Sequence, residues 1–141
     1  MFVLDTNVVS EWTRVRPDPR VMQWLDAHPV EELFLTAVSL AELRYGLAVL
    51  PAGRRKRVLV EQIEGLVIPL FAGRVLAFGE AASRHYADIQ SQARRLGRPM
   101  PLADALIAAM AREWGLAVAT RNVRDFEASG LEVVNPWEPR S

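Results

Sequence analysis

The sequence predicts an α/β fold: a three-layer sandwich in which a central parallel sheet of four to five strands is flanked by helices. Short apolar runs of strand length alternate with stretches whose apolar residues recur at helical spacing. Because parallel neighbours in a sheet need crossover connections, this alternation favours a parallel sheet covered on both faces. Half of the 141 residues are apolar, and no repeat or internal linker interrupts them. We therefore expect one domain over residues 1–141.

The first half of the chain is expected to give two strands and three helices. Each strand is a short apolar run, and each helix is an apolar pattern with a spacing of three to four residues. Asp5, Thr6 and Asn7 are residues that cap helices, and Pro51 closes the last helix of this half. In order, the expected elements are strand 2–4, helix 8–12, helix 21–25, strand 33–35 and helix 36–50.

The second half repeats the alternation and ends on a strand. Gly97 and Gly115 each follow a helical pattern, and Pro101 opens the most apolar helix of the chain. In order, the expected elements are an amphipathic helix 54–66, strand 74–78, helix 81–96, helix 102–114, strand 117–120, a short helix near Asp125 and strand 131–134.

Composition excludes several classes of site. The chain has no cysteine, which excludes disulfides, thiolate metal sites and a cysteine nucleophile. Seventeen basic residues balance seventeen acidic ones, so any grip on nucleic acid has to come from local patches. No apolar run reaches the roughly 18 residues of a membrane-spanning helix. The first residues lack the basic segment of a signal peptide, and we expect a cytoplasmic protein with no membrane partner.

Three carboxylates occupy positions that call for an explanation. Asp5 follows the first strand directly, and ligands of open parallel sheets bind beyond the carboxyl ends of the strands. Asp104 lies in a helix that is otherwise apolar on all sides, where a charge is costly unless a cation or the helix dipole compensates for it. Glu42 has apolar neighbours in the helix at 36–50.

Each of these acids also has an ordinary explanation. Asp5 can cap the first helix, Glu42 can be a surface glutamate paired with Arg44 or another arginine, and Asp104 can serve the dipole at an open helix end. In three βα units, however, all three would converge at one end of the sheet. Oxygen ligands, without cysteine and with only two histidines at no metal-binding spacing, favour Mg²⁺ or Mn²⁺ over zinc.

Five segments, taken in order, resemble the PIN-domain ribonucleases. Within that family the resemblance is to the VapC-type toxins of bacterial type II toxin-antitoxin pairs, especially the FitB-like branch. Each motif is weak by itself, but their order and spacing are specific and span nearly the whole chain. The segments are Leu4–Val8, Ala41–Gly46, Pro101–Ala108, Ala119–Asn122 with Asp125 and Phe126, and Asn135–Trp137.

The resemblance implies a PIN-like fold and a set of residue roles. Asn122 stands where the family often has a fourth acid, which leaves a second metal position open. Asp125 is one candidate substitute and the Asn122 carbonyl oxygen is another, while a helix cap is the ordinary explanation of Asp125. The implied metal-binding and catalytic acids are Asp5, Glu42 and Asp104, and the implied site-shaping residues are Thr6, Asn7 and Thr120.

The resemblance also implies an activity and partners. The activity is endonucleolytic hydrolysis of RNA by water with Mg²⁺ or Mn²⁺, which leaves a 5′-phosphate, and structured RNAs such as transfer RNA are plausible targets. The partners are a VapB- or FitA-like antitoxin and a second copy in a homodimer, while promoter DNA is bound only through the antitoxin. Exposed apolar residues on the early helices, including Trp12 and Trp24, would then face a partner.

Two basic runs are candidates for contacts with RNA phosphates, and such contacts would weaken as salt rises. Solvated helix faces are the alternative explanation of both runs. The four tryptophans are expected in the core rather than stacked on bases. The basic residues are Arg54, Arg55, Lys56 and Arg57 in the first run, and Arg94 and Arg95, with Arg98 nearby, in the second.

Two other functions stay open at this point. A catalytically weak or inactive PIN-fold module, which acts by binding or regulation in its antitoxin complex, is motivated by Asn122. A phosphatase with Asp5 as nucleophile is motivated by its place at a strand end, although such chemistry commonly uses a second acid where this chain has Asn7.

Overall fold

The computed structural model describes residues 1–138 and contains a five-stranded sheet with the strand order β3-β2-β1-β4-β5. Every neighbouring pair of strands is parallel, so the predicted α/β class and parallel sheet are confirmed. The described strands are β1 (Phe2–Leu4), β2 (Leu33–Thr36), β3 (Val75–Leu76), β4 (Ala117–Ala119) and β5 (Val133–Val134).

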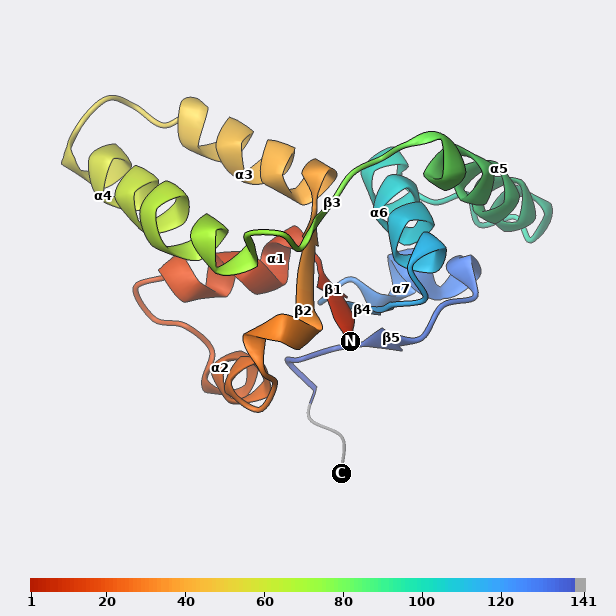
Figure 1. Cartoon of the computed structure of the whole chain (residues 1–141), viewed down its shortest axis with the longest axis horizontal. Coiled ribbons are helices and arrows are strands. Elements are labelled where there is room, and N and C mark those ends of the chain that lie inside the picture. The colour runs from red at the N-terminus through yellow and green to blue at the C-terminus, as the bar shows by residue number, and fades with distance from the viewer. Residues whose placement is uncertain (139–141) are drawn as a thin grey trace.

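Helices cover both faces of this sheet. Figure 1 shows α1 to α4 on one side of the strands and α5 to α7 on the other. None of the helices within residues 1–138 is long and apolar enough to cross a membrane. The helices are α1 (Thr6–Val9), α2 (Pro19–Asp26), α3 (Ala37–Ala48), α4 (Arg54–Gln62), α5 (Glu80–Arg95), α6 (Leu102–Glu113) and α7 (Val123–Phe126).

The sheet separates two hydrophobic cores. Successive residues of a strand point to opposite faces, so Val3 packs under α5 and α6 while Leu4 packs under α1 to α4. Val118 and Ala119 divide in the same way on the neighbouring strand. Both faces of the central strands are therefore buried, which explains why these strands read as unbroken apolar runs rather than as an alternating pattern.

The expected helix at 54–66 is shorter than predicted. α4 ends at Gln62, and the chain continues as a π-helical turn, η3 (Ile63–Val67), and a 3-10 turn, η4 (Ile68–Phe71). This change of winding places Ile63, Val67 and Phe71 in the core beneath α3. An amphipathic sequence pattern does not reveal such a change of winding, because apolar residues spaced four apart fit either an α-helix or a π-helix.

The tryptophans differ in burial. Trp137 is buried, and Trp12 and Trp24 are partly buried against the core formed with α1 to α4. Trp114 is 61% exposed, so the expectation that all four lie in the core is wrong for this residue. Trp114 comes directly after α6, at the C-cap position of that helix.

Hydrogen bonds at the carboxyl end of the sheet fix the starts of the following helices. The Asp5 amide donates to the carbonyl oxygen of Ala119 at 2.9 Å, which joins the end of β1 to the end of β4. Thr36, the last residue of β2, caps α3 by accepting the Ser39 amide at 3.0 Å. The helices α1 and α3 thus begin at the carboxyl end of the sheet.

Candidate active site

Asp5 is held by several hydrogen bonds at the end of β1. It is 5% exposed, and its Oδ1 accepts the Thr6 amide at 2.8 Å as the cap of α1. Its Oδ2 accepts the Thr120 hydroxyl at 2.7 Å and the Asn7 amide at 3.4 Å. Burial raises the pKa of Asp5, the hydrogen bonds oppose that shift, and repulsion by Asp125 adds to it. Asp5 is therefore both a helix cap and a carboxylate at a strand end.

Asp104 lies in the first turn of α6 and is half-buried. Burial and then repulsion by Asp5, Asp125 and Glu42 raise its pKa to about 6. No hydrogen bond to its carboxylate occurs within residues 1–138. Six of the twelve residues of α6 are buried, all of them between Ala105 and Ala111, but the start of the helix is open, and Leu102 is 64% exposed. Asp104 therefore faces three other acids at the partly exposed start of the helix.

Glu42 is exposed on α3 and joins the site through Thr6. The Thr6 hydroxyl donates to Glu42 Oε1 at 2.8 Å, although the two residues are 36 positions apart. The alternative explanation of Glu42, a surface glutamate paired with Arg44 or another arginine, is right about its exposure, but Arg44 binds Glu64 at 2.8 Å instead. The residue that follows Asp5 therefore orients a carboxylate from a second βα unit.

The fourth carboxylate near these acids is Asp125. It raises the pKa of Asp5 and of Asp104, so its charge reaches both. α7 begins at Val123, which places Asp125 inside the first turn, and the interpretation of Asp125 as a helix cap is wrong. Asn122 occupies the cap position, and its side chain makes no capping hydrogen bond.

Thr120 and Asn7 connect the two strand ends beneath the acids. Thr120 is fully buried, donates to Asp5, and accepts the backbone amide of Asn122 at 2.9 Å. Asn7 donates to Asp5, and its Oδ1 accepts the Arg121 amide at 3.3 Å. These bonds fix the segment after β4 against the segment after β1.

Asp5, Glu42, Asp104 and Asp125 thus come from four separate segments and interact electrostatically at one edge of the sheet. Within residues 1–138, however, no three side chains of the metal-binding types are close enough to hold one ion as they stand. Like charges repel, and the raised pKa of Asp104 records that repulsion. The donor set consists of oxygen atoms, which is the set that Mg²⁺ and Mn²⁺ prefer.

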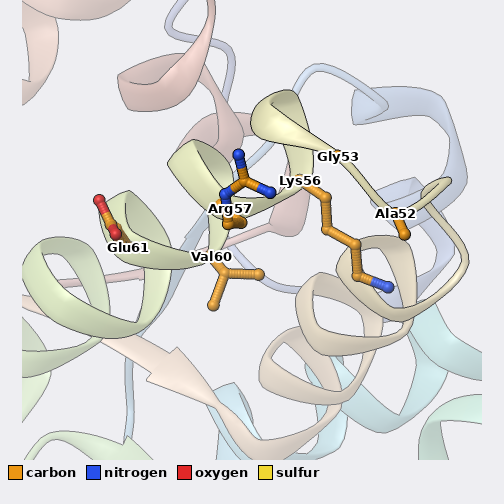
Figure 2. A pocket seen from close by; sticks show the side chains of 6 residues that line it. All are labelled: Ala52, Gly53, Lys56, Arg57, Val60 and Glu61. Carbon is orange, nitrogen blue, oxygen red and sulfur yellow. The ribbon is translucent and has the colours of Figure 1, made fainter.

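The basic run at 54–57 does not form one surface. Figure 2 shows Lys56 extending toward the end of α3, while Arg57 points in another direction. The Lys56 ammonium donates to the carbonyl oxygens of Ala48 at 3.1 Å and Leu50 at 3.3 Å. Lys56 therefore caps the carboxyl end of α3, where a cation is favourable.

The other basic candidates are scattered. Arg54 and Arg55 line a groove of about 930 Å³ between α4 and the segment after α1. Arg98 forms an ion pair with Glu127 at 2.6 Å, which occupies much of its charge. The arginines at 94–95 are exposed in the last turn of α5. The proposed contacts of these runs with RNA stay predictions.

Sequence analysis missed three isolated arginines that line hollows: Arg16, Arg121 and Arg124. Arg124 lines a hollow together with Asp125, and Arg16 lines a second hollow together with Arg121, the neighbour of Thr120 in the chain. The sequence held a signal for Arg121 and Arg124, because both lie in the segment that also carries Thr120 and Asp125. The basic candidates named from the sequence were runs of basic residues, and these single arginines belong to no such run.

Comparisons with known proteins agree with this architecture. The family model of the PIN domain matches residues 2–129. "VapC ribonuclease Y4jK" of Sinorhizobium fredii is 50% identical over 139 residues, which cover 99% of each chain. "Toxin FitB" of Neisseria gonorrhoeae is 46% identical over 137 residues, covering 97% of this chain and 99% of the relative.

A solved structure extends the likeness to three dimensions. The structure titled "Structure of FitAB bound to IR36 DNA fragment" contains a chain with a TM-score of 0.96 and 43% identity to this one. The match covers 100% of this chain and 99% of that chain. The chain therefore belongs to the PIN-domain family, among the VapC- and FitB-type toxins of toxin-antitoxin systems.

Proposed function

We propose that this protein is a Mg²⁺- or Mn²⁺-dependent endoribonuclease and the toxin of a type II toxin-antitoxin pair. One observation carries the metal-dependent reading: Asp5, Glu42, Asp104 and Asp125 come from four segments and interact electrostatically at the carboxyl end of the sheet, where burial first and then repulsion by the other three acids raises the pKa of Asp104. Four acids from four segments have no structural need to lie so close, because each could be solvated separately. A divalent cation would relieve their repulsion.

The donor chemistry of the residues present fits such an ion, and the carboxylates would have to close on it, because no three of them within residues 1–138 are close enough to hold it as they stand. Asp5, Glu42 and Asp104 would hold it with carboxylate oxygens, and Asp125 would supply the acid that Asn122 does not. When bound, the ion supplies charge neutralisation at the phosphodiester and lowers the pKa of a water molecule.

The residues of the protein contribute by positioning the carboxylates. Thr120 and the Thr6 amide fix the carboxylate of Asp5, and the Thr6 hydroxyl orients Glu42. Asp104 keeps its proton more readily than an ordinary aspartate and is thus the acid whose charge depends most on its surroundings. Attack by water then needs no nucleophilic side chain, in agreement with the absence of cysteine.

The names of the relatives support RNA as substrate and an antitoxin as partner. A relative from Shigella flexneri is named "tRNA(fMet)-specific endonuclease VapC", which supports a structured RNA such as transfer RNA. Solved relatives are toxin-antitoxin complexes, some of them bound to DNA. We therefore infer a VapB- or FitA-like antitoxin, promoter DNA bound through it, and a homodimeric toxin.

Cleavage by purified protein, free of antitoxin, tests the proposal. Transfer RNA is incubated with Mg²⁺ or Mn²⁺ and, in parallel, with a chelator. We expect cleavage with either ion, products with 5′-phosphates, and a loss of more than about a hundredfold in Asp5→Asn and Asp104→Asn. The exposed Asp88 on α5 gives a matched control, Asp88→Asn, that should retain activity.

Two outcomes would contradict the proposal. Equal cleavage by the wild type and Asp104→Asn would assign the activity to another site or to a contaminant. A wild type that binds its antitoxin but cuts no RNA with either ion would favour the binding or regulatory module.

A further inference from the structure

Two hollows contain arginines from the segment that follows β4, which also carries Thr120 and Asp125. The first, which we name the Arg121 hollow, has a volume of about 440 Å³. The second, the Arg124 hollow, has a volume of about 240 Å³. The Arg121 hollow is lined by Glu11, Arg14, Arg16, Pro17, Asp18, Pro19, Arg121 and Trp137, and the Arg124 hollow by Arg98, Pro99, Pro101, Arg124, Asp125 and Ala128.

The acids of the Arg121 hollow are already paired. Arg20 binds Asp18 through two nitrogens, at 2.8 and 3.1 Å, and holds the pKa of that carboxyl at about 2. The buried Glu11 accepts the Asp18 amide at 2.7 Å and lies 3.4 Å from Arg14. What remains for a ligand in this hollow is therefore the positive charge of its other arginines. One of them, Arg121, also helps to lower the pKa of Asp18, after the larger effect of Arg20.

Arg16 and Arg121 are those arginines. Neither forms an ion pair within residues 1–138. The Arg121 guanidinium lies 5.2 Å from the centre of the Trp137 ring, and Trp137 is buried. One face of the guanidinium thus rests on an indole, which orients its donors without neutralising them.

In the Arg124 hollow, Arg124 is the cation that has no ion pair with any residue of the described chain. Arg98 is paired with Glu127, whereas Arg124 is exposed and makes no ion pair within the described chain. Asp125, one of the four acids, lines the same hollow. Pro101, another lining residue, opens the helix that carries Asp104.

The two hollows lie on opposite faces of the sheet. Trp137 of the Arg121 hollow belongs to the core formed with α1 to α4, and Ala128 of the Arg124 hollow packs on the core formed with α5 to α7. Between them Thr120 and Asp5 lie at the carboxyl edge of the sheet. The acids are therefore flanked by free arginines on both sides.

We infer that a single strand of RNA crosses the acids from one hollow to the other, with Arg16 and Arg121 binding backbone phosphates on one side and Arg124 on the other. This inference rests on the proposed function. A cluster of four carboxylates repels a polyanion, so the strand needs cations on both flanks to stay over it. The arginine fork suits phosphate, and Arg121 also offers a flat face on which a base can stack.

Binding of a short fluorescent single-stranded RNA over a series of salt concentrations tests this. The Asp104→Asn protein in Mg²⁺ serves as the parent, so that binding is read without turnover. Each of Arg16→Gln, Arg121→Gln and Arg124→Gln should weaken binding about threefold to tenfold and lower the salt slope by about 0.7. The triple variant should lower the slope by about 2. Arg121→Lys should keep the slope while losing part of the affinity.

The control is Arg84→Gln, which removes an exposed arginine paired with Glu80 on α5 and should change neither quantity. The inference is overturned if the triple variant binds like the parent, if Arg84→Gln loses as much, or if the parent binds no RNA. It is also overturned if the triple variant binds RNA like the parent but no longer binds an acidic peptide such as polyglutamate, because the surface would then belong to a protein partner. Failure of the proposed function is read separately, as absence of cleavage by the wild type.

Discussion

Asp5 and Asp104 are both acids at the start of a helix, yet the fold treats them in opposite ways. Asp5 is nearly buried and accepts hydrogen bonds from Thr6, Thr120 and Asn7. Asp104 is half-buried, and within residues 1–138 it is surrounded by charge of its own sign rather than by donors. One carboxylate is fixed by hydrogen bonds from the protein, and the other has none within residues 1–138, so under our proposal a cation would compensate its charge.

This difference separates the part of the site that folding completes from the part that needs a ligand. The donors around Asp5 belong to the chain, so its position contributes to the stability of the fold. The charge of Asp104 opposes the metal-free fold, because burial and three other acids favour its neutral form. Removing each side chain should therefore change stability in opposite directions.

The largest effect is expected for Asp5→Ala. The buried Thr120 hydroxyl and the Thr6 amide lose their acceptor, which costs about 1 to 3 kcal/mol, and part of that cost is offset because a carboxylate whose pKa is raised by burial is also removed. Urea unfolding in the presence of a chelator measures this loss. Asp5→Asn keeps one acceptor oxygen and should lose less, and Asp88→Ala on the surface should lose almost nothing. An Asp5→Ala protein as stable as the wild type would show that these hydrogen bonds do not support the fold.

The contrast also shows which parts of the molecule could be predicted from sequence. Apolar runs followed by capping residues predict strand, cap and helix, and that pattern located β1 and Asp5. The unbroken apolar surroundings of Asp104 indicated a charge in an unfavourable place. Both inferences rest on residues that are neighbours in the chain, and interactions between such neighbours can be judged from the sequence. The fold class followed from the same local patterns, since the alternation of strands and helices leaves few arrangements of a parallel sheet.

Contacts between distant segments could not be predicted in this way. No local signal shows that Thr6 binds Glu42, or that Asp125 rather than Asn122 brings a carboxylate to Asp5 and Asp104. The exposure of Trp114 depends likewise on where α6 ends relative to the sheet. The roles of the acids in catalysis stay predictions, while their placement is a property of the structure.

A smaller effect of opposite sign is expected for Asp104→Ala without metal. Relief of repulsion should raise stability by up to about 1 kcal/mol, after allowance for solvent screening of a half-exposed group and for the lost helix-dipole term. Added Mn²⁺ should stabilise the wild type and leave this variant almost unchanged. Thermal unfolding with and without Mn²⁺ measures both effects. A loss of stability in the metal-free variant would mean that Asp104 supports the fold.

The same comparison predicts a pH dependence. Asp104 has an ordinary pKa of 3.8, and in the folded protein its pKa is raised to about 6. Between these values the folded state binds more protons than the unfolded state, so this group's contribution to stability falls as pH rises from about 4 to 6 and then levels off. Urea unfolding of wild type and Asp104→Ala across this range isolates the contribution as a difference between two curves. Parallel curves would show that the pKa of Asp104 is not raised.

The smallest effect is expected for Thr6→Val, which removes the hydroxyl that orients Glu42 and keeps the backbone amide that donates to the Asp5 carboxylate. Glu42 is exposed, so losing this bond should cost little stability, but the carboxylate would sample more rotamers and bind an ion less often in the right position. We expect Mn²⁺ affinity, measured by calorimetry, to fall about twofold to fivefold. Thr13→Val is the matched control, because the Thr13 hydroxyl binds only the carbonyl oxygen of Ser10 in the same segment. Equal affinities for Mn²⁺ in the two variants would place Glu42 outside the metal site and leave Asp5, Asp104 and Asp125 as its ligands.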